Sequence, residues 1–239
     1  MKRWPHVAAA VGLTLVASAA ALPAGAQATK GAADKAASAA RPAAAVTAAG
    51  STNAANAANA ANAVNVLYAE RFSKVCAACH GANGRSDMAG TPVLAGQHSL
   101  FTITQLFLLR EGRRNNEAMV AMAKTMTDAD LRGFSEFIGT LPPVPAATPA
   151  AAPDEARMSK GQSLAQQHKC LFCHGTALDG GQGVPRIGGQ KEDYVRAALH
   201  GYKTGERPGY TRAMSEALSQ VPVGDLDLLA YYVANFTGK

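Results

Sequence analysis

The sequence predicts an all-α protein made of two small helical modules in tandem. A Cys-x-x-Cys-His stretch occurs twice, at residues 76–80 and 170–174. Further stretches match between the two halves at offsets of 93 to 95 residues, and self-similarity at a fixed offset indicates a duplicated module. Within each copy the large apolar residues recur at helical spacing, and the segments between them are rich in Gly and Pro.

The internal repeat extends well beyond the two cysteine stretches. Residues 91–97 match residues 184–190 at an offset of 93, and Gly112 matches Gly205 at the same offset. Other pairs match at an offset of 95: Met119 with Met214, and Asp130-Leu131 with Asp225-Leu226. Each copy has roughly 80 residues, which is small for a hydrophobic core. A large apolar group bound inside each copy would supply the missing buried area.

Three helices are expected in each module, in the same order. The first leads into the cysteine stretch, at 66–75 and 159–169. The second spans 99–110 and 191–203, and the closing helix spans 127–140 and 223–235. Thr127, with Asp130 three residues later, has the pattern of a capped helix start. Each closing helix carries an apolar face: Phe134, Phe137 and Ile138 in the first, and Leu229, Tyr232 and Val233 in the second.

The N-terminus has the pattern of an export signal. Lys2 and Arg3 precede an apolar run over residues 7–22, and Ala24-Gly25-Ala26 has the small residues of a cleavage site. We therefore predict a cleaved signal peptide over residues 1–26, a mature chain that starts at Gln27, and export to the periplasm. The alternative is an uncleaved anchor, although the apolar run is barely long enough to span a bilayer.

Composition divides the rest of the chain into four parts. Residues 27–65 are rich in Ala and Asn and lack periodic large apolar residues, which predicts a disordered, solvated tail. The two modules are expected over 66–141 and 158–239. Residues 142–157 between them are rich in Pro and Ala and predict an extended linker.

The four cysteines are the strongest indication of function. A redox-active pair would need neither the adjacent histidine nor a second copy. One shared zinc site is disfavoured because 90 residues separate the two pairs, and a disulfide across two residues has poor geometry. The pattern is typical of covalent c-type haem attachment. We expect two haem c groups, held by Cys76 and Cys79 and by Cys170 and Cys173, with His80 and His174 as iron ligands.

The sixth iron ligand is expected to be a methionine, since His/Met ligation is typical of electron-transfer haems. In the second module Met158 precedes the cysteines, which leaves Met214. Its repeat partner in the first module is Met119, so Met122 and Met126 are expected to be core residues. Histidine ligation is disfavoured because the remaining candidates have no repeat partner: His98, His168 and His200.

Each expected iron-binding histidine also needs an acceptor for its other ring N–H. Pro92 and Pro185 stand at matched positions in the loops that follow the two cysteine stretches. A proline carbonyl is free to accept, because proline has no N–H of its own to satisfy. We expect these carbonyls to accept from His80 and His174; the alternative is that both prolines only form turns.

These motifs resemble those of the di-haem cytochrome c4 family. The resemblance covers about residues 66–239 and rests on Cys-x-x-Cys-His-Gly at 76–81 and 170–175, and on Pro-x-Leu/Ile-x-Gly-Gln at 92–97 and 185–190. It implies two class I cytochrome c modules related by pseudo-twofold symmetry, with haem propionate edges that face one another. It also implies His/Met ligation through His80 with Met119 and through His174 with Met214. The tail and the linker lie outside the family pattern.

The motifs and the resemblance together predict a periplasmic electron carrier and no enzyme. Its partners would be redox proteins: a quinol-oxidising complex or a dehydrogenase as donor, and a terminal oxidase or reductase as acceptor. The haem supplies the chemistry, so no catalytic residues are needed. The alternative is a haem-bearing subunit of a periplasmic dehydrogenase complex. A di-haem peroxidase is disfavoured because it needs one iron with an open position, whereas both modules offer a methionine.

Charge adds little to this interpretation. The chain carries a net charge of +6, but residues 66–141 hold 8 basic and 7 acidic groups, and residues 142–239 hold 10 and 9. The modules are therefore nearly neutral, and no nucleic acid is expected as a partner.

We expect a monomer, with peripheral membrane association as an alternative to full solubility. Leu171-Phe172, which replace Ala77-Ala78 of the first module, are expected to shield the second haem and raise its reduction potential.

Overall fold

The computed structural model describes residues 47–144, 152–181 and 183–238, and the side chains from residue 58 onward. The predicted signal peptide, the predicted cleavage position, the first part of the predicted tail and the middle of the predicted linker lie outside these ranges. Within them every regular element is a helix, and strand-like pairing is limited to one isolated bridge between Gly181 and Val184. The all-α prediction is confirmed for this part of the chain. The described residues belong to one compact unit.

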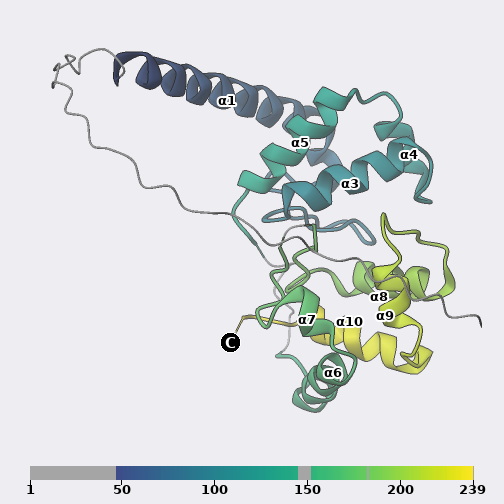
Figure 1. Ribbon diagram of the computed structural model, residues 1–239. Helices are drawn as coiled ribbons and strands as arrows, with labels where there is room; N and C mark the ends of the chain where they lie inside the picture. The colour runs from purple at the N-terminus through teal and green to yellow at the C-terminus, as the bar shows by residue number, and fades with distance from the viewer. Residues whose placement is uncertain (1–46, 145–151, 182, 239) are drawn as a thin grey trace, which may run out of the picture. The chain divides into compact units, whose positions relative to one another are not determined.

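The helices follow the same order in both modules (Figure 1). The first module contains α1 (Thr47–Val75), α2 (Ala77–His80), α3 (Ser99–Arg110), α4 (Glu117–Ala123) and α5 (Asp128–Thr140). The second contains α6 (Glu155–Gln167), α7 (Cys170–His174), α8 (Glu192–Thr204), α9 (Ala213–Leu218), the 3-10 turn η1 (Val223–Asp225) and α10 (Leu226–Ala234). Helices α1 and α3 pack against α5, and α6 and α8 pack against α10. The first, second and closing helices therefore form the core of each module.

Two short helices, α4 and α9, were not expected from the sequence. Each has fewer than eight residues and lies just before the closing helix of its module. Such short helices do not show a full hydrophobic period, so the pattern of apolar residues does not predict them. They matter because each carries one of the two methionines expected to bind iron.

Helix α1 is much longer than the sequence predicts. It begins at Thr47, whereas helix is expected only from Val66, so residues 47–65 of the predicted tail are helical. Residues 58–64 are exposed, which agrees with the lack of large apolar residues there. Alanine has the highest helix propensity, and a helix already formed and docked at its C-terminal end extends at little cost. No helix of the described residues is both long enough and apolar enough to span a membrane.

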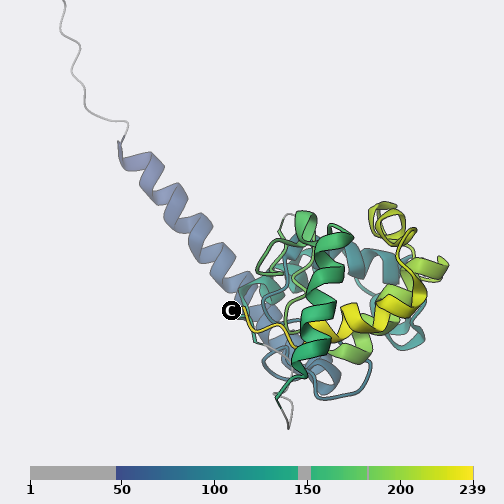
Figure 2. The same cartoon turned by 90° about the horizontal axis from the view of Figure 1, so that it is seen from below.

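The two cores each contain a close helix crossing built around one glycine. In the first module Gly133 of α5 faces the ring of Tyr68 on α1, and a Cβ at this position would lie 1.9 Å from a ring carbon. In the second module Gly161 of α6 faces Tyr232 of α10, and its Cβ would lie 2.5 Å from the tyrosine Cβ. Figure 2 shows α6 (green) crossing α10 (yellow). Any side chain larger than hydrogen would force these helices apart.

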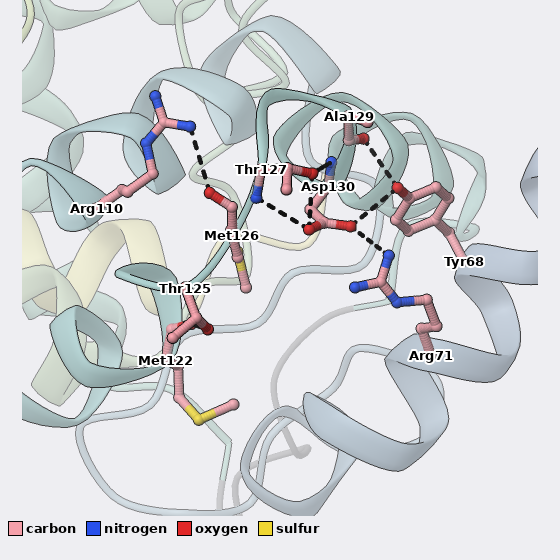
Figure 3. A network of polar contacts seen from close by, with 9 residues as sticks. All are labelled: Tyr68, Arg71, Arg110, Met122, Thr125, Met126, Thr127, Ala129 and Asp130. Carbon is pink, nitrogen blue, oxygen red and sulfur yellow. Dashed lines mark hydrogen bonds and ion pairs between the residues drawn. The ribbon is translucent and has the colours of Figure 1, made fainter.

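A polar network fixes the start of α5 against α1 (Figure 3). The Asp130 carboxylate accepts from the Tyr68 hydroxyl at 3.1 Å and from the Thr127 backbone N–H at 2.9 Å, and it pairs with Arg71. The Thr127 hydroxyl in turn accepts from the Asp130 N–H, which completes the predicted capping box. Hydrogen bonding from Arg71 holds the pKa of Asp130 well below its usual range.

The two modules meet through the loops that follow their cysteine helices. The Gly90 N–H donates to the Asp193 carboxylate at 2.6 Å, and His98 Nε2 lies 2.6 Å from the Asp179 carbonyl oxygen. Lys191 also reaches the carbonyl of Met88. Each of these contacts joins the loop of one module to the start of α3 or α8 in the other, across 81 to 103 positions of sequence.

Candidate functional site

The two Cys-x-x-Cys-His stretches adopt the same local structure. Cys76 directly precedes α2, which ends at His80, and Cys170 opens α7, which ends at His174. In each stretch the first cysteine is half-buried and the second is exposed. A glycine with a positive φ follows each histidine, at 77° for Gly81 and 76° for Gly175, and turns the chain into the loop.

The cysteines do not match the competing interpretations. All four are free thiols in the structure. No cluster of three or more His, Cys, Asp or Glu side chains suited to a metal ion occurs among the described residues. Burial raises the pKa of Cys76 to about 11 and also raises that of Cys170. A redox-active cysteine pair needs a lowered thiol pKa, so these thiols have the opposite character.

Both histidines are buried, and each has one ring nitrogen fixed by a proline carbonyl. His80 and His174 are each 6% exposed. Nδ1 of His80 lies 3.1 Å from the carbonyl oxygen of Pro92, and Nδ1 of His174 lies 3.1 Å from that of Pro185. A carbonyl oxygen can only accept, so Nδ1 carries the proton in both rings. Nε2 of a neutral ring then keeps its lone pair, which is the form that binds a metal.

Burial also keeps these rings neutral. It lowers the pKa of His80 and of His174, and the bond to the proline carbonyl offsets this only in part. The proline loops are held in equivalent ways. Leu94 N–H donates to the Gly84 carbonyl at 2.7 Å, and Ile187 N–H donates to the Leu178 carbonyl at 2.9 Å. Both acceptors have a positive φ, at 74° and 52°. The contacts expected of Pro92 and Pro185 are therefore present in the structure.

Met119 and Met214 lie at equivalent places in the two modules. Met119 is on α4 and packs against the core of the first module, and Met214 is on α9 and packs against the core of the second. Both are half-buried. The Asn116 side chain caps α4 by accepting from the Met119 N–H at 2.9 Å. The structure therefore contains one partly buried methionine on a short helix in each module.

One expectation for a nearby residue is wrong, and another loses part of its support. Met122 is 42% exposed and does not belong to the core, whereas Met126 does pack against it. Figure 3 shows Met126 beside the start of α5 and Met122 farther from it, on α4. Leu171 packs against the core of the second module, but Phe172 is 90% exposed and shields little. The higher potential expected for the second haem therefore loses part of its physical basis.

A cationic cluster that the sequence analysis missed lies between the modules. Arg114 of the first module and Arg207 of the second donate to the Tyr194 hydroxyl at 3.1 and 2.9 Å. Burial raises the pKa of Tyr194, but the two guanidinium groups lower it by more, to about 8. Arg114 and Arg207 are repeat partners at an offset of 93, and this duplication is the signal that could have identified them.

The cluster contains more positive charge than its surroundings neutralise. Neither arginine forms an ion pair with a carboxylate in the part of the chain that the structure describes. The Nε of Arg207 is buried without a hydrogen-bond partner. Buried charges are normally paired, so the cluster suits the carboxylates of a bound group. The free thiols, the histidines with a free Nε2 lone pair and this cluster fit a bound porphyrin. The cluster would suit its two propionate carboxylates.

The other three histidines of the described residues lie outside the two sites. His98 contacts the Asp179 carbonyl, and the exposed ring of His200 lies 3.3 Å from Asp227. The Nε2 atom of His168 is buried without a partner. None of the three corresponds to the place of Met119 or Met214 in its module, and their exclusion as iron ligands stays a prediction.

Comparisons with known proteins point in one direction. The cytochrome c family model matches residues 67–142. Cytochrome c4 of Thiocapsa roseopersicina is 36% identical over 139 residues, which cover 54% of this chain and 69% of the relative. A thiosulfate dehydrogenase electron acceptor of Thiomonas intermedia is 34% identical over 143 residues, which cover 56% of this chain and 65%, just under two thirds, of that relative.

Solved structures give the same fold. Reduced recombinant cytochrome c4 from Pseudomonas stutzeri superimposes with a TM-score of 0.63 and covers 71% of this chain and 97% of its own, at 24% identity. Thiosulfate dehydrogenase from Marichromatium purpuratum gives a TM-score of 0.59 at 30% identity, over 67% of this chain but only 36% of its own.

Proposed function

This chain belongs to the cytochrome c4 family and is an electron-transfer c-type cytochrome, and we propose that it carries two covalent haem c groups, one in each module. One observation carries the proposal: a buried histidine with a fixed tautomer follows a pair of free cysteines, and this arrangement occurs twice. Haem c supplies a one-electron Fe(III)/Fe(II) couple when it is bound.

The residues of the chain bind and orient the group. Cys76 and Cys79 would form the thioethers in the first module, and Cys170 and Cys173 those in the second. His80 and His174 would bind iron through Nε2, because Nδ1 is held by a proline carbonyl. Met119 and Met214, on α4 and α9, would supply a further iron ligand in each module. Arg114, Tyr194 and Arg207 would receive propionate carboxylates.

Electron transfer requires rigidity rather than catalytic groups. The histidine rings are buried, hydrogen-bonded to proline carbonyls and attached to short helices that pack on the leading helices, which restricts their movement. Proteins of this family transfer electrons and are generally not enzymes. No proton donor or substrate pocket is needed for this role.

We further propose that the protein works in the periplasm after removal of residues 1–26, and that its partners are redox proteins. A dehydrogenase as electron donor is supported by the relatives named as acceptors of thiosulfate dehydrogenase. The match to part of a thiosulfate dehydrogenase supports a second candidate, a haem-bearing subunit of a dehydrogenase complex. Co-purification at fixed stoichiometry distinguishes that subunit from a free carrier.

The test of the haem proposal is an intact mass measurement combined with a spectroscopic redox titration of the mature protein. The mass should exceed that of the polypeptide by two haems, and the oxidised protein should show the absorption band of methionine-bound Fe(III). A single haem, or bound zinc, would contradict the proposal. The same mass locates the N-terminus, and a chain that still contains residues 1–26 would contradict the predicted cleavage.

A further inference from the structure

Two glutamines at matched repeat positions cross the interface between the modules. Gln97 of the first module and Gln190 of the second are each 7% exposed. Gln190 Oε1 accepts from the Val93 N–H at 2.9 Å, and its Nε2 donates to the Val93 carbonyl at 2.9 Å. Gln97 binds the Arg186 backbone in the same way, at 3.0 Å for both bonds. Each glutamine side chain therefore forms two hydrogen bonds with the backbone of one residue in the opposite module.

The two residues bound by the glutamines, Val93 and Arg186, directly follow the prolines whose carbonyls accept from the histidines. The Val93 N–H and the Pro92 carbonyl belong to one peptide group, so this group donates to Gln190 and accepts from His80 Nδ1. In the second module the peptide group between Pro185 and Arg186 donates to Gln97 and accepts from His174. A continuous hydrogen-bonded path thus joins each glutamine to the histidine of the other module.

We propose that Gln97 and Gln190 are positioning residues that tune the reduction potential of the opposite module, an inference that rests on the proposed haem function. An acceptor on a peptide N–H polarises the amide and makes its carbonyl oxygen more negative, because hydrogen bonds in a chain strengthen one another. A stronger acceptor at Nδ1–H makes the ring a more basic ligand. A more basic ligand stabilises Fe(III) and lowers the potential.

Other contacts between the modules lack this path. His98 binds the carbonyl of Asp179, and Asp193 accepts from Gly90, but neither contact involves a peptide group that binds His80 or His174. The interface therefore contains contacts that only join the modules and contacts that also lead to a histidine. This difference provides a matched control for the experiment.

The test measures both haem potentials in the holoprotein with Gln190→Leu and, separately, with Gln97→Leu. The effect should be crossed: Gln190→Leu should raise the first-module potential and leave the second unchanged, and Gln97→Leu should do the reverse. In the reduced protein the NMR signal of His80 Nδ1–H should shift in Gln190→Leu, and that of His174 in Gln97→Leu. His98→Ala, a change at the same interface, should shift neither potential.

Three results would overturn the inference: a shift only in the module that carries the substitution, equal shifts of both haems, or an equally large shift with His98→Ala. The two variants are independent, so if one does not fold the other still decides the matter. Haem content by mass separates a failure of the proposed haem function from a failure of the proposed tuning role. A protein with fewer than two haems contradicts the proposed function, whereas two haems without a crossed shift contradict only the tuning role.

Discussion

In the first module a tyrosine of the leading helix faces a glycine of the closing helix, whereas in the second the glycine is on the leading helix and the tyrosine on the closing one. The positions correspond only in part, because Tyr68 matches Gly161 at an offset of 93, whereas Gly133 matches Leu228 at 95 and Tyr232 matches Phe137, one helical turn further on. The crossing requires one large and one small partner. Which helix supplies the small one has changed between the copies.

The starts of the closing helices differ as well. Helix α5 has the Thr127 capping box and the Asp130–Arg71 pair. At the equivalent place in the second module η1 precedes α10, and Pro222 there provides no side-chain cap. Both helices bury the matched leucine, Leu131 and Leu226, but Asp227 at the start of α10 contacts Arg196 and His200 instead of forming a capping box. Duplicated modules keep their ligand geometry while their means of stabilisation diverge.

Exchange of the axial methionines should give the largest difference between the modules. Met119→His should lower only the first-module potential, and Met214→His only the second, because imidazole stabilises Fe(III) relative to a thioether. The change should be a sizeable part of the roughly 0.8 V range that axial ligands span. Spectroelectrochemical titration measures it, and Met122→Leu serves as the control. Loss of the methionine–iron band in Met122→Leu would show that the assigned ligand is wrong.

Filling the helix crossings should give the next largest effect. Gly133→Ala and Gly161→Ala should each lower the free energy of unfolding by about 1–3 kcal/mol, since the new methyl group has no space. Denaturant unfolding followed by circular dichroism measures the change. Gly224→Ala is the control, because no atom lies within 4 Å of its added Cβ.

The exchanged crossing allows a sharper version of this experiment. The double variant Tyr68→Gly with Gly133→Leu places in the first module the residue types found at Gly161 and Leu228. It should be more stable than Gly133→Leu alone, although it also loses the Tyr68 hydrogen bond to Asp130. A double variant that is no more stable would contradict the idea that a glycine on the leading helix makes room for a large residue on the closing helix.

Acid should destabilise the first module through Asp130. Its pKa is lower in the folded than in the unfolded state, so its contribution is present above about pH 4 and is lost as pH falls further. Asp130→Asn should cost about 1–2 kcal/mol at neutral pH and less in acid. Asp225→Asn at the matched position is the control, because Asp225 forms no described ion pair. A cost of Asp130→Asn that does not depend on pH would contradict the ionic origin.

Deletion of residues 47–64 should have the smallest effect. Residues 58–64 of α1 are exposed, and changes at exposed positions usually stay within about 0.5 kcal/mol. Thermal unfolding should therefore be nearly unchanged, as should both potentials. A clear loss of stability would indicate that the extension packs on the module. The matched helix α6 has no such extension, because it starts at Glu155 and is capped by Asp154.

Long amphipathic helices and the cysteine stretches are predictable from the sequence because their signals are local and periodic. Helix α3 has the expected bounds, and the Thr127 cap is where its side chain predicts it. The start of α1 is not predictable from apolar spacing, because its N-terminal part forms by propensity alone. The Tyr194 cluster is only partly predictable: the repeat pairs Arg114 with Arg207, but nothing in the sequence shows that the fold brings both to one hydroxyl.

The crossed glutamines also matter for anyone who wants to recombine such modules. A fusion that joins the second module to an unrelated first module would keep its own cysteines, histidine and methionine, yet its Arg186 backbone would lose Gln97. The transplanted module would contain every residue that attaches haem or binds iron, and it would still lack a hydrogen bond that is proposed to set its reduction potential. The two loops that face each other therefore act together, and a chimera should exchange both of them.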